Sequence, residues 1–519
     1  MTFESADDAL SQGMVLAYHA ALRPDNLAVA TRYGDRSFSE LNGRVNQLAR
    51  MLRAHDIQSG DAIAVVTRNR PEFVEAYYAA MRIGVRVTPV NWHLTGPEVG
   101  YIIDNCEAKA VIYDAGLSTG EEAAAQAANC SLRLAVGGPV PGFVDMENAL
   151  GSFATTDIGD PERGSSMLYT SGTTGRPKGV YRREQPVQRS DSQQRASGDP
   201  DTDRNLCTGP AYHAAPLVFN IVAPLNAGVG VVMMDRWDAE ETLRLIQEYA
   251  ITHTHMVATM FHRMLQLPEA VRGGYDLSSL KFVIHGAAPC PVHVKHAIIE
   301  WFGPIIFEYY AATEGGNNFL IDSETWLQKP GSVGRAPDPE STRILDDDGV
   351  AVPQGESGFI YFRAPEVGRF EYFKAQQKTS ESYRGDWFTL GDIGYFDEDG
   401  FLFLSGRSAE TIISGGVNIY PQEIDAELLK HPDVADVCTV GVPSEEWGEE
   451  VKSVVQLKTG SSASRELAES VMAFARDRLP GFKCPRSVDF ADDLPRLPSG
   501  KIQRRHVRAP YWIGRDKQI

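Results

Sequence analysis

The sequence is short of several features that mark particular classes of protein. Its 519 residues contain only six cysteines, scattered and without a CxxC pair. This excludes a dense disulfide framework and predicts reduced thiols in a cytoplasmic protein. Lysine and arginine together number 50 against 69 aspartate and glutamate, so the net charge is −19. Such a deficit of positive charge excludes a broad basic surface and argues against a nucleic-acid-binding protein.

Long apolar segments are also missing. The N-terminal stretch MTFESADDAL is acidic and lacks the apolar core of a signal peptide. Residues 205–234 contain no charged side chain, but prolines, asparagines and glycines interrupt them. This stretch therefore predicts a buried helix followed by a buried strand, with no integral membrane segment. GxSxG, GxxxxGK[ST] and GxGxxG are absent, and no acid or cysteine near His253, His255 and His262 completes a zinc site.

What is present indicates a large globular protein. The composition is 43% hydrophobic and 23% charged, and the length allows three or four units of roughly 150 residues. Helical patterns such as 38–55 alternate with short apolar runs, which favours parallel α/β layers. From residue 331 the pattern changes to short strands and turns, including a DEDG hairpin signal at 397–400. We expect an N-terminal domain of residues 1–406, a C-terminal domain of residues 407–519, and a mobile surface loop at 182–204.

The sharpest local pattern is YTSGTTGRPKGV at residues 169–180. Its glycines let backbone N–H groups converge on an anion, its hydroxyl groups add donors, and Lys178 adds a point charge. The lysine is followed by Gly179, so this is not a P-loop. The pattern favours phosphate binding over its alternative, a plain flexible turn.

Further motifs follow this loop in order: HGAAP (285–289), YYAATE (309–314), WFTLGD (387–392), SGR (405–407), GGVNIYPQEI (415–424) and LPSGKI (497–502). Together they resemble the signature of the adenylate-forming superfamily, which comprises acyl-CoA synthetases, adenylation domains and firefly-type luciferases. The resemblance covers more than 300 residues. It implies an α/β fold with a large multi-lobed N-terminal domain, built from two α/β sheet layers and a small β-barrel, and a small mobile α+β C-terminal domain.

The resemblance also implies a reaction in two halves. A carboxylate first attacks the α-phosphate of ATP, which gives an acyl-adenylate and pyrophosphate. A thiol, usually that of coenzyme A, then attacks the activated carbonyl. ATP, Mg²⁺ and coenzyme A are therefore the expected cofactors. Because both halves bring anions together, catalysis must come from fixed cations, hydrogen-bond donors and positioning.

Roles of single residues follow from the resemblance. Lys501 is the strongest catalytic candidate, with Thr313 donating to the α-phosphate, Glu314 binding Mg²⁺ and Lys178 acting in the phosphate loop. The other expected phosphate ligands are Thr170, Ser171, Gly172, Thr173 and Thr174. The expected adenine and ribose ligands are Gly286, Ala287, Ala288, Pro289, Tyr309, Tyr310 and Asp392. Arg407 is expected to contact the ribose or a phosphate. Gly415 and Gly416 are expected in the pantetheine channel.

Taken alone, each of these residues has a plainer interpretation. Glu314 suits a helix N-terminus, Tyr310 an apolar core, Asp392 a turn cap, and Lys501 an exposed surface. The motif context reverses that interpretation for Lys501. At the hinge between the two domains, where the family usually has Asp or Lys, this sequence has Ala409.

The expected acid-binding residues are Tyr212, His213 and Ala311. His213 contacts the carboxylate, gates the pocket or is a core histidine, and the sequence leaves these three alternatives open. Ala311 stands where the family usually has glycine, which narrows the carboxylate site. Since residues 205–234 offer no acid to pair with a substrate ammonium, they disfavour amino acids and favour an apolar acid. The HGAAPCP segment most resembles bacterial ligases for fatty and steroid-side-chain acids.

The sequence therefore predicts an ATP-dependent acid–CoA ligase whose partners are small molecules: a carboxylic acid, ATP and CoA. A homodimer is left open. The alternatives are an aryl-CoA ligase, an enzyme that loads a carrier-protein thiol, and an inactive nucleotide-binding sensor. The intact Lys178, Glu314, Asp392 and Lys501 argue against the sensor.

Overall fold

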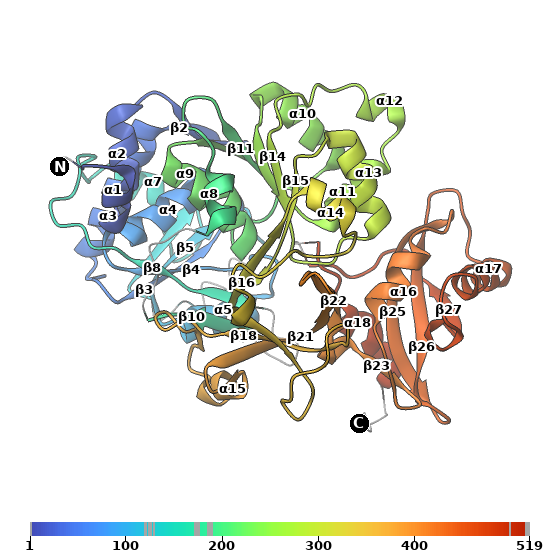
Figure 1. The fold of residues 1–519 in the computed structure, drawn as a ribbon. Helices are drawn as coiled ribbons and strands as arrows, with labels where there is room; N and C mark the ends of the chain where they lie inside the picture. Colours follow the sequence, from blue (N-terminus) through green and yellow to red (C-terminus); the bar gives the residue numbers. More distant parts are fainter. Residues whose placement is uncertain are drawn as a thin grey trace.

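The computed structural model describes residues 3–118, 122, 127, 130–170, 177–183, 190–497 and 500–513. Figure 1 shows a large body, which runs from the N-terminus through the blue, green and yellow segments, and a smaller red lobe beside it at the C-terminal end. This mixed α/β architecture agrees with the predicted fold class.

The first sheet of the large body is parallel throughout, with the strand order β7-β6-β5-β3-β4-β8. Its strands are β3 (Ala62–Val66), β4 (Arg86–Pro89), β5 (Ala108–Asp114), β6 (Leu132–Val136), β7 (Val144–Asp145) and β8 (Ser165–Ser166). Every residue of β3 is buried, as its unbroken apolar sequence AIAVV predicts for a strand covered on both faces. The helices α5 (Gly96–Asn105) and α7 (Met146–Leu150) belong to this region.

The second sheet has the order β16-β15-β14-β13-β11-β12-β1-β2 and is parallel except at its two edges. Its strands are β1 (Leu27–Thr31), β2 (Gly34–Ser37), β11 (Arg204–Cys207), β12 (Gly230–Met233), β13 (His253–Met256), β14 (Phe282–His285), β15 (Ile306–Ala312) and β16 (Gly315–Ile321). Its helices are α1 (Ala6–Ser11), α2 (Val15–Leu22), α8 (Asp191–Ser197), α9 (Ala223–Ala227), α10 (Ala239–Tyr249), α11 (Ala258–Leu265), α12 (Glu269–Arg272), α13 (Val292–Phe302) and α14 (Ser323–Gln328).

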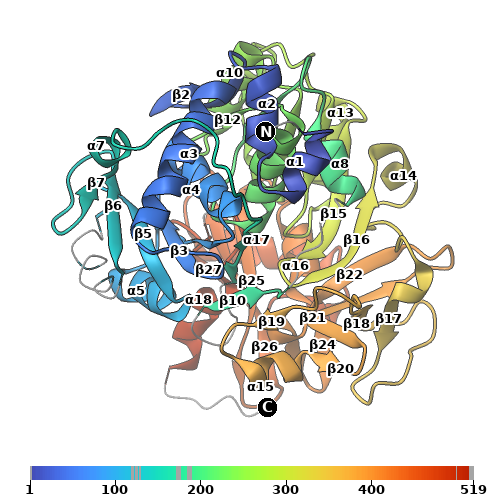
Figure 2. The same ribbon diagram turned by 90° about the vertical axis from the view of Figure 1, so that its left-hand side faces the viewer.

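Two helices, α3 (Phe38–Ala54) and α4 (Pro71–Arg82), pack against each other and join the two sheets. Figure 2 shows them between β3 and β5 on one side and β2 and β12 on the other. A capping box at Ser37 and Glu40 starts α3, and Pro71 occupies the first turn of α4, where its missing N–H costs nothing. Their apolar residues form one core with those of β1, β3 and β12.

Two smaller antiparallel sheets follow. The region expected to form a small barrel contains a five-stranded sheet of β17 (Thr342–Leu345), β18 (Gly358–Arg363), β20 (Tyr383–Arg384), β21 (Trp387–Phe396) and β22 (Leu402–Arg407). Strands β21 and β22 form the hairpin that the DEDG pattern predicts. The other sheet joins β9 (Leu168–Thr170), β10 (Lys178–Tyr181) and β19 (Glu371–Tyr372), with α15 (Gln376–Glu381) after it.

The C-terminal lobe is built on a sheet of its own. Its strands are β23 (Ile412–Ser414), β24 (Val417–Ile419), β25 (Val434–Ser444), β26 (Gly448–Leu457) and β27 (Ser487–Phe490). Its helices are α16 (Pro421–Leu428), α17 (Arg465–Arg476) and α18 (Arg504–Arg508). Helices α16 and α17 cover the apolar core of this sheet, so the lobe has its own hydrophobic interior.

Two expectations for the chain between residues 182 and 234 need correction. The polar segment 182–204, expected to be a loop, contains α8, which starts at a capping box of Ser190 and Gln193. The uncharged stretch does give a helix followed by a strand, but β11 occupies its start. Its helix begins as a π-helix, Pro216–Val222, before it becomes α9. A π-helix is rare and is often found at functional sites.

No helix in the described ranges combines the length and the apolar character that crossing a membrane requires. All six cysteines are free thiols, and all but Cys290 are buried.

Candidate active site

The phosphate loop joins two adjacent antiparallel strands. Lys178 at the start of β10 lies directly opposite Thr170 at the end of β9. Ser171, Gly172, Thr173 and Thr174 lie outside the described residues. The two ends of the loop are thus held side by side, with Lys178 at its base.

Glu314 lies in the tight turn between β15 and β16, where Ala312 is paired with Gly315. The helix N-terminus considered for this residue is therefore wrong. Its carboxylate accepts a hydrogen bond of 2.9 Å from the hydroxyl of Tyr372, and the Nζ of Lys178 lies 5.0 Å from the centre of the same tyrosine ring. Tyr372 thus bridges the phosphate loop and the YYAATE motif.

Tyr372 is a site residue that the sequence analysis missed. It lies in β19, which pairs with β10, although almost 200 residues separate the two strands in sequence. Burial and the nearby Glu314 raise the pKa of the Tyr372 hydroxyl, so this group stays protonated and donates. Arg182, which directly follows β10, gives this strand a second link to the YYAATE motif. Its guanidinium donates to the backbone carbonyl of Thr313 at 2.9 Å.

Three of the residues predicted to bind the nucleotide form a hydrogen-bonded trio around the buried Asp392. Asp392 accepts hydrogen bonds from the hydroxyl of Tyr310 at 2.8 Å and from the Nε of Arg407 at 2.7 Å. Asp392 and Arg407 are direct partners across β21 and β22, so the hairpin fixes their pairing. Burial and the Asp392 carboxylate raise the pKa of Tyr310 well above its ordinary value. Two motifs that lie some 80 residues apart in sequence are thus joined by direct hydrogen bonds.

Gly286 has a steric reason to be glycine. A Cβ atom at this position would lie 2.5 Å from the ring of Tyr309 and 2.7 Å from its backbone carbonyl oxygen. The following residue, Ala287, adopts a left-handed conformation with φ of 66°. The segment that Ala288 and Pro289 continue therefore turns sharply at the end of β14, against the strand that carries the two tyrosines.

Tyr309 and Tyr310 are neighbours with different surroundings. Tyr309 is 8% exposed and packs against the ring of Phe219 at 4.9 Å between centres. Its hydroxyl lies 3.2 Å from the Nε2 of His255, and burial lowers the pKa of that histidine to about 3. Ala311, the next residue but one, packs on the same apolar cluster. Tyr309 therefore packs against the π-helix that contains Phe219, whereas Tyr310 contacts the ion pair of Asp392 and Arg407.

Tyr212 and His213 follow β11 along the chain, and Ala215, two residues after His213, packs on this apolar cluster. The Tyr212 hydroxyl is 3.0 Å from the Nδ1 of His93. Burial and the neighbouring His93 lower the pKa of His213 to about 4, so its imidazole is neutral at pH 7. The Nε2 of His213 is buried and has no hydrogen-bond partner within the described ranges. This atom can therefore bind a ligand oxygen.

Lys501 reaches the site from the C-terminal lobe. Burial lowers the pKa of its ammonium, the guanidinium of Arg407 lowers it further, and the carboxylates of Glu410, Asp392 and Glu314 oppose this shift. The ammonium is thus within electrostatic range of both the Asp392–Arg407 pair and the Glu314 turn. Lys501 is half-buried, so the surface position considered for a lone lysine is wrong.

Gly415 and Gly416 form the turn between β23 and β24, and both are left-handed, with φ of 58° and 81°. A Cβ atom on Gly415 would lie 2.6 Å from the ring of Trp447. Within the described ranges, no hydrogen bond or ion pair joins the two glycines to the groups around Lys501.

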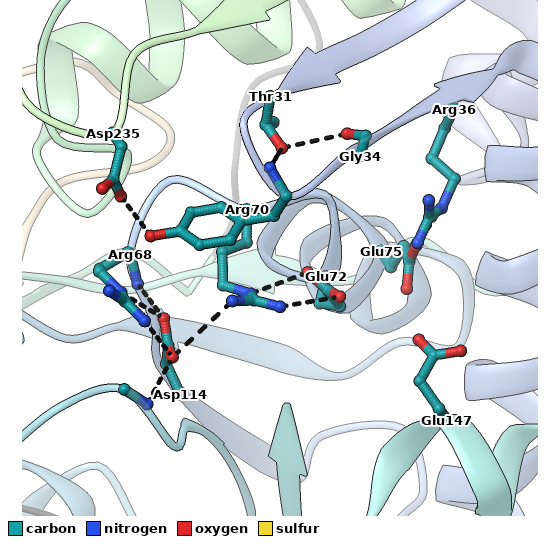
Figure 3. Close-up of polar contacts among 12 residues, drawn as sticks. Thr31, Gly34, Arg36, Arg68, Arg70, Glu72, Glu75, Asp114, Glu147 and Asp235 are labelled. Carbon is teal, nitrogen blue, oxygen red and sulfur yellow. Dashed lines mark hydrogen bonds and ion pairs between the residues drawn. The ribbon is translucent and has the colours of Figure 1, made fainter. Parts of the chain in front are cut away.

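A dense charged network in the large body is not a candidate anion site, because its charges are already paired. Figure 3 shows Arg68 directed at Asp114 and Arg70 directed at Glu72. Arg68 donates to both carboxylate oxygens of Asp114 at 2.8 Å, and Arg70 donates to Glu72 at 3.1 Å. The side chain of Asp114 is fully buried. The network therefore ties the ends of β3 and β5 together.

The comparisons with known proteins bear on these motifs directly. The profile of the AMP-binding enzyme family matches residues 16–370, and that of the AMP-binding enzyme C-terminal domain matches residues 423–501. The chain belongs to the AMP-binding enzyme family. The predicted adenylate-forming superfamily is thus confirmed for this AMP-binding enzyme.

Relatives match over nearly their whole length. The indoleacetate–CoA ligase of Aromatoleum aromaticum is 31% identical over 498 residues, which cover 94% of this chain and 96% of that protein. The long-chain-fatty-acid–CoA ligase FadD13 of Mycobacterium tuberculosis is 31% identical over 486 residues, which cover 92% and 93%. Both are CoA ligases, in agreement with the enzyme class predicted for this AMP-binding enzyme.

Solved structures show the same fold. The anthranilate CoA ligase AuaEII, crystallised with anthranoyl-AMP, has a TM-score of 0.84 at 23% identity and covers 98% of this chain and 97% of its own. ATP-bound MatB from Rhodopseudomonas palustris has a TM-score of 0.80 at 28% identity and covers 96% and 99%. The fold predicted for this AMP-binding enzyme is confirmed.

Proposed function

We propose that the protein is an ATP-dependent acid–CoA ligase, which activates a carboxylic acid as its acyl-adenylate and transfers the acyl group to coenzyme A. The observation that carries this proposal is that Lys501 lies half-buried within electrostatic range of the Asp392–Arg407 pair and Glu314. These residues come from four motifs and two lobes of the chain. Such a convergence of cationic and hydrogen-bonding groups suits a reaction between two anions.

In the first half-reaction, a carboxylate oxygen of the acid attacks the α-phosphorus of ATP. The bond between the α-phosphorus and its bridging oxygen breaks, and pyrophosphate leaves. Tyr310 would stack on adenine, Asp392 would accept the ribose hydroxyls, and Thr170 and Lys178 would hold the leaving phosphates. Lys501 would stabilise the negative charge that develops between the carboxylate and the α-phosphate.

Mg²⁺ fits this site as a companion of ATP. The described residues contain no group of three or more His, Cys, Asp or Glu side chains that could enclose a metal ion. Mg²⁺ is commonly held by one or two carboxylates and substrate phosphates, and the Glu314 carboxylate can provide that contact. When bound, the ion would neutralise phosphate charge and polarise the α-phosphate.

In the second half-reaction, the thiol sulfur of coenzyme A attacks the acyl carbon, the bond to the AMP oxygen breaks, and the thiol proton passes to solvent. We place the boundary between the two domains after Gly406, with the second domain as a mobile lid. Strand β22 ends at Arg407 in a sheet of the large body, and β23 begins the lobe's own sheet at Ile412, which supports this division. Gly415 and Gly416 would line the pantetheine channel. The six free thiols support a cytoplasmic location.

For the acid, we propose an apolar molecule, with a fatty or bulky alicyclic acid favoured and an aryl acid as the alternative. The proposed acid side contains Phe219 and Tyr309 with a neutral His255. His213, which is also neutral, offers one free nitrogen to the carboxylate. A substrate ammonium would find no carboxylate between residues 205 and 234, which supports the exclusion of amino acids.

Incubation of the protein with ATP, Mg²⁺, CoA and a panel of fatty, alicyclic and aryl acids tests this proposal. We expect acid-dependent release of pyrophosphate and AMP in step with acyl-CoA. Pyrophosphate release without acyl-CoA would favour an enzyme that loads a carrier-protein thiol. If no acid of the panel releases pyrophosphate, the proposed function is wrong.

The bridge through Tyr372 gives a prediction about metal dependence. Tyr372→Phe removes the hydroxyl that donates to Glu314, so the carboxylate is less firmly oriented. We expect the Mg²⁺ concentration for half-maximal pyrophosphate release to rise about tenfold, as is typical when a group that orients a metal ligand is lost. Tyr383→Phe is a matched control, because that hydroxyl donates to the carbonyl of Phe370 instead. Equal Mg²⁺ requirements in the two variants would contradict the assigned role of Tyr372.

A further inference from the structure

Helix α11 of the large body touches the C-terminal lobe at two points, through Thr259 and His262. We propose that these two side chains are positioning residues that dock the turn carrying Lys501 over the site for adenylate formation. The inference rests on the proposed function. It adds to the proposed function a specific contact surface on α11, a helix that carries none of the sequence motifs.

The first contact is made at the residue before the lysine. The hydroxyl of Thr259 donates to the backbone carbonyl of Gly500 at 3.3 Å. Gly500 has φ of +80°, and a Cβ atom there would lie 2.4 Å from the Thr259 oxygen and 3.0 Å from a methyl group of Val257. The backbone of the lysine turn therefore lies directly on the start of α11, at a distance that only glycine allows.

The second contact is made one helical turn further along. The Nε2 of His262 lies 2.9 Å from the carbonyl oxygen of Ala435 in β25, so the imidazole donates from this nitrogen. Thr259 and His262 are three residues apart and thus share one face of α11.

The two contact points are tied to each other inside the lobe. Arg496 donates to both carboxylate oxygens of Asp436, at 2.9 and 2.6 Å, and Asp436 follows Ala435 directly. Another nitrogen of Arg496 donates to the carbonyl of Gly500 at 2.7 Å. Arg496 therefore connects the two contact points, Gly500 and Ala435, inside the lobe. Helix α11 contacts both of them.

This docking decides where the catalytic ammonium lies. Lys501 is bonded to Gly500, and the backbone N–H of Leu497 donates to the Lys501 carbonyl at 2.8 Å, so the lysine backbone is held on both sides. Helix α11 follows β13, and β13 pairs with β14, the strand that Gly286 directly follows. The sheet that positions the segment proposed to bind adenine therefore also positions Lys501.

Substitutions on α11 should act on one half-reaction. We expect Thr259→Val and His262→Ala each to slow acyl-adenylate formation about 3- to 10-fold, and the double variant about 10- to 100-fold, since one hydrogen bond is typically worth such a factor. The KM for ATP and the rate of acyl transfer from supplied acyl-adenylate to CoA should change less than about twofold. Arg263→Ala, an exposed position of the same helix, is the matched control.

A comparison in the Lys501→Ala background separates positioning from a general structural effect. If Thr259 and His262 act only through the lysine, the double substitution should cost less than about twofold there, because coupled residues are not additive. The same loss in both backgrounds, or an equal loss in both half-reactions, would overturn the proposal.

Limited trypsin digestion gives a readout that needs no activity. With its docking contacts removed, the double variant should be cleaved at Arg407 several-fold faster than the wild type, at an unchanged melting temperature. If the acid panel gives no product but cleavage is faster, the proposed function fails and the docking contact stands. Unchanged cleavage would overturn the docking contact itself.

Discussion

Replacement of Lys501 by alanine is expected to lower the rate of acyl-adenylate formation about 10³-fold, since the loss of one preorganised charge or donor in an active site typically costs 10²–10³-fold. The physical reason lies in the geometry. The ammonium reaches the site from the C-terminal lobe, where burial and Arg407 already lower its pKa. A group held in a partly dry environment acts more strongly on developing charge than one in water. Acid-dependent pyrophosphate release in a rapid-quench experiment measures the effect.

The same variant should bind ATP almost as well as the wild type, because Tyr310, Asp392 and the phosphate loop are untouched. Equilibrium binding of a non-hydrolysable ATP analogue is therefore expected to change less than about threefold. Arg465→Ala removes a positive charge from α17, an exposed position of the same lobe, and should leave both quantities unchanged. Wild-type rates in Lys501→Ala would refute the assignment of the lysine.

The fold could be predicted from the sequence wherever the local pattern decided it. The buried strand β3 and the capped helix α3 have unambiguous periodicity and boundaries, and both formed as expected. Helix α8 was missed because its composition is polar. Its Ser190–Gln193 capping signature was nevertheless present and could have revealed it. The π-helix could not have been foreseen, since a single shift in hydrogen-bond register leaves the apolar pattern almost unchanged.

The candidate site, like the fold, could be predicted from the sequence only in part. Motifs identified Tyr310, Asp392 and Arg407, and the structure joins these three by hydrogen bonds. Tyr372 and Thr259 belong to no motif, and each contributes through a contact between segments far apart in sequence. Such contacts depend on how sheets and lobes pack, which local spacing does not encode. Sequence therefore identified the groups proposed to touch the substrates, while the groups that orient them became visible only in three dimensions.

The second large effect is expected at Asp392. Asp392→Ala removes the acceptor of the Tyr310 hydroxyl and leaves the Arg407 guanidinium without its partner in a site where Asp392 itself is only 7% exposed. We expect kcat/KM for ATP to fall about 10²-fold, near the lower end of what truncation of a buried charged pair costs. The loss should appear mainly as a higher KM, because the aspartate is proposed to orient the nucleotide. Initial rates of pyrophosphate release over a range of ATP concentrations measure it.

Asp392→Asn separates charge from hydrogen bonding at the same position. The amide can turn its oxygen to Arg407 and its nitrogen to the Tyr310 hydroxyl, so both hydrogen bonds survive while the negative charge is lost. Its loss in kcat/KM should therefore be about tenfold, between wild type and alanine, because a charge-assisted bond is roughly twice as strong as a neutral one. Tyr310→Phe should add less to Asp392→Ala than to the wild type, since the hydroxyl has then already lost its acceptor. Strict additivity of these two substitutions would show that the contact between them does not orient the nucleotide.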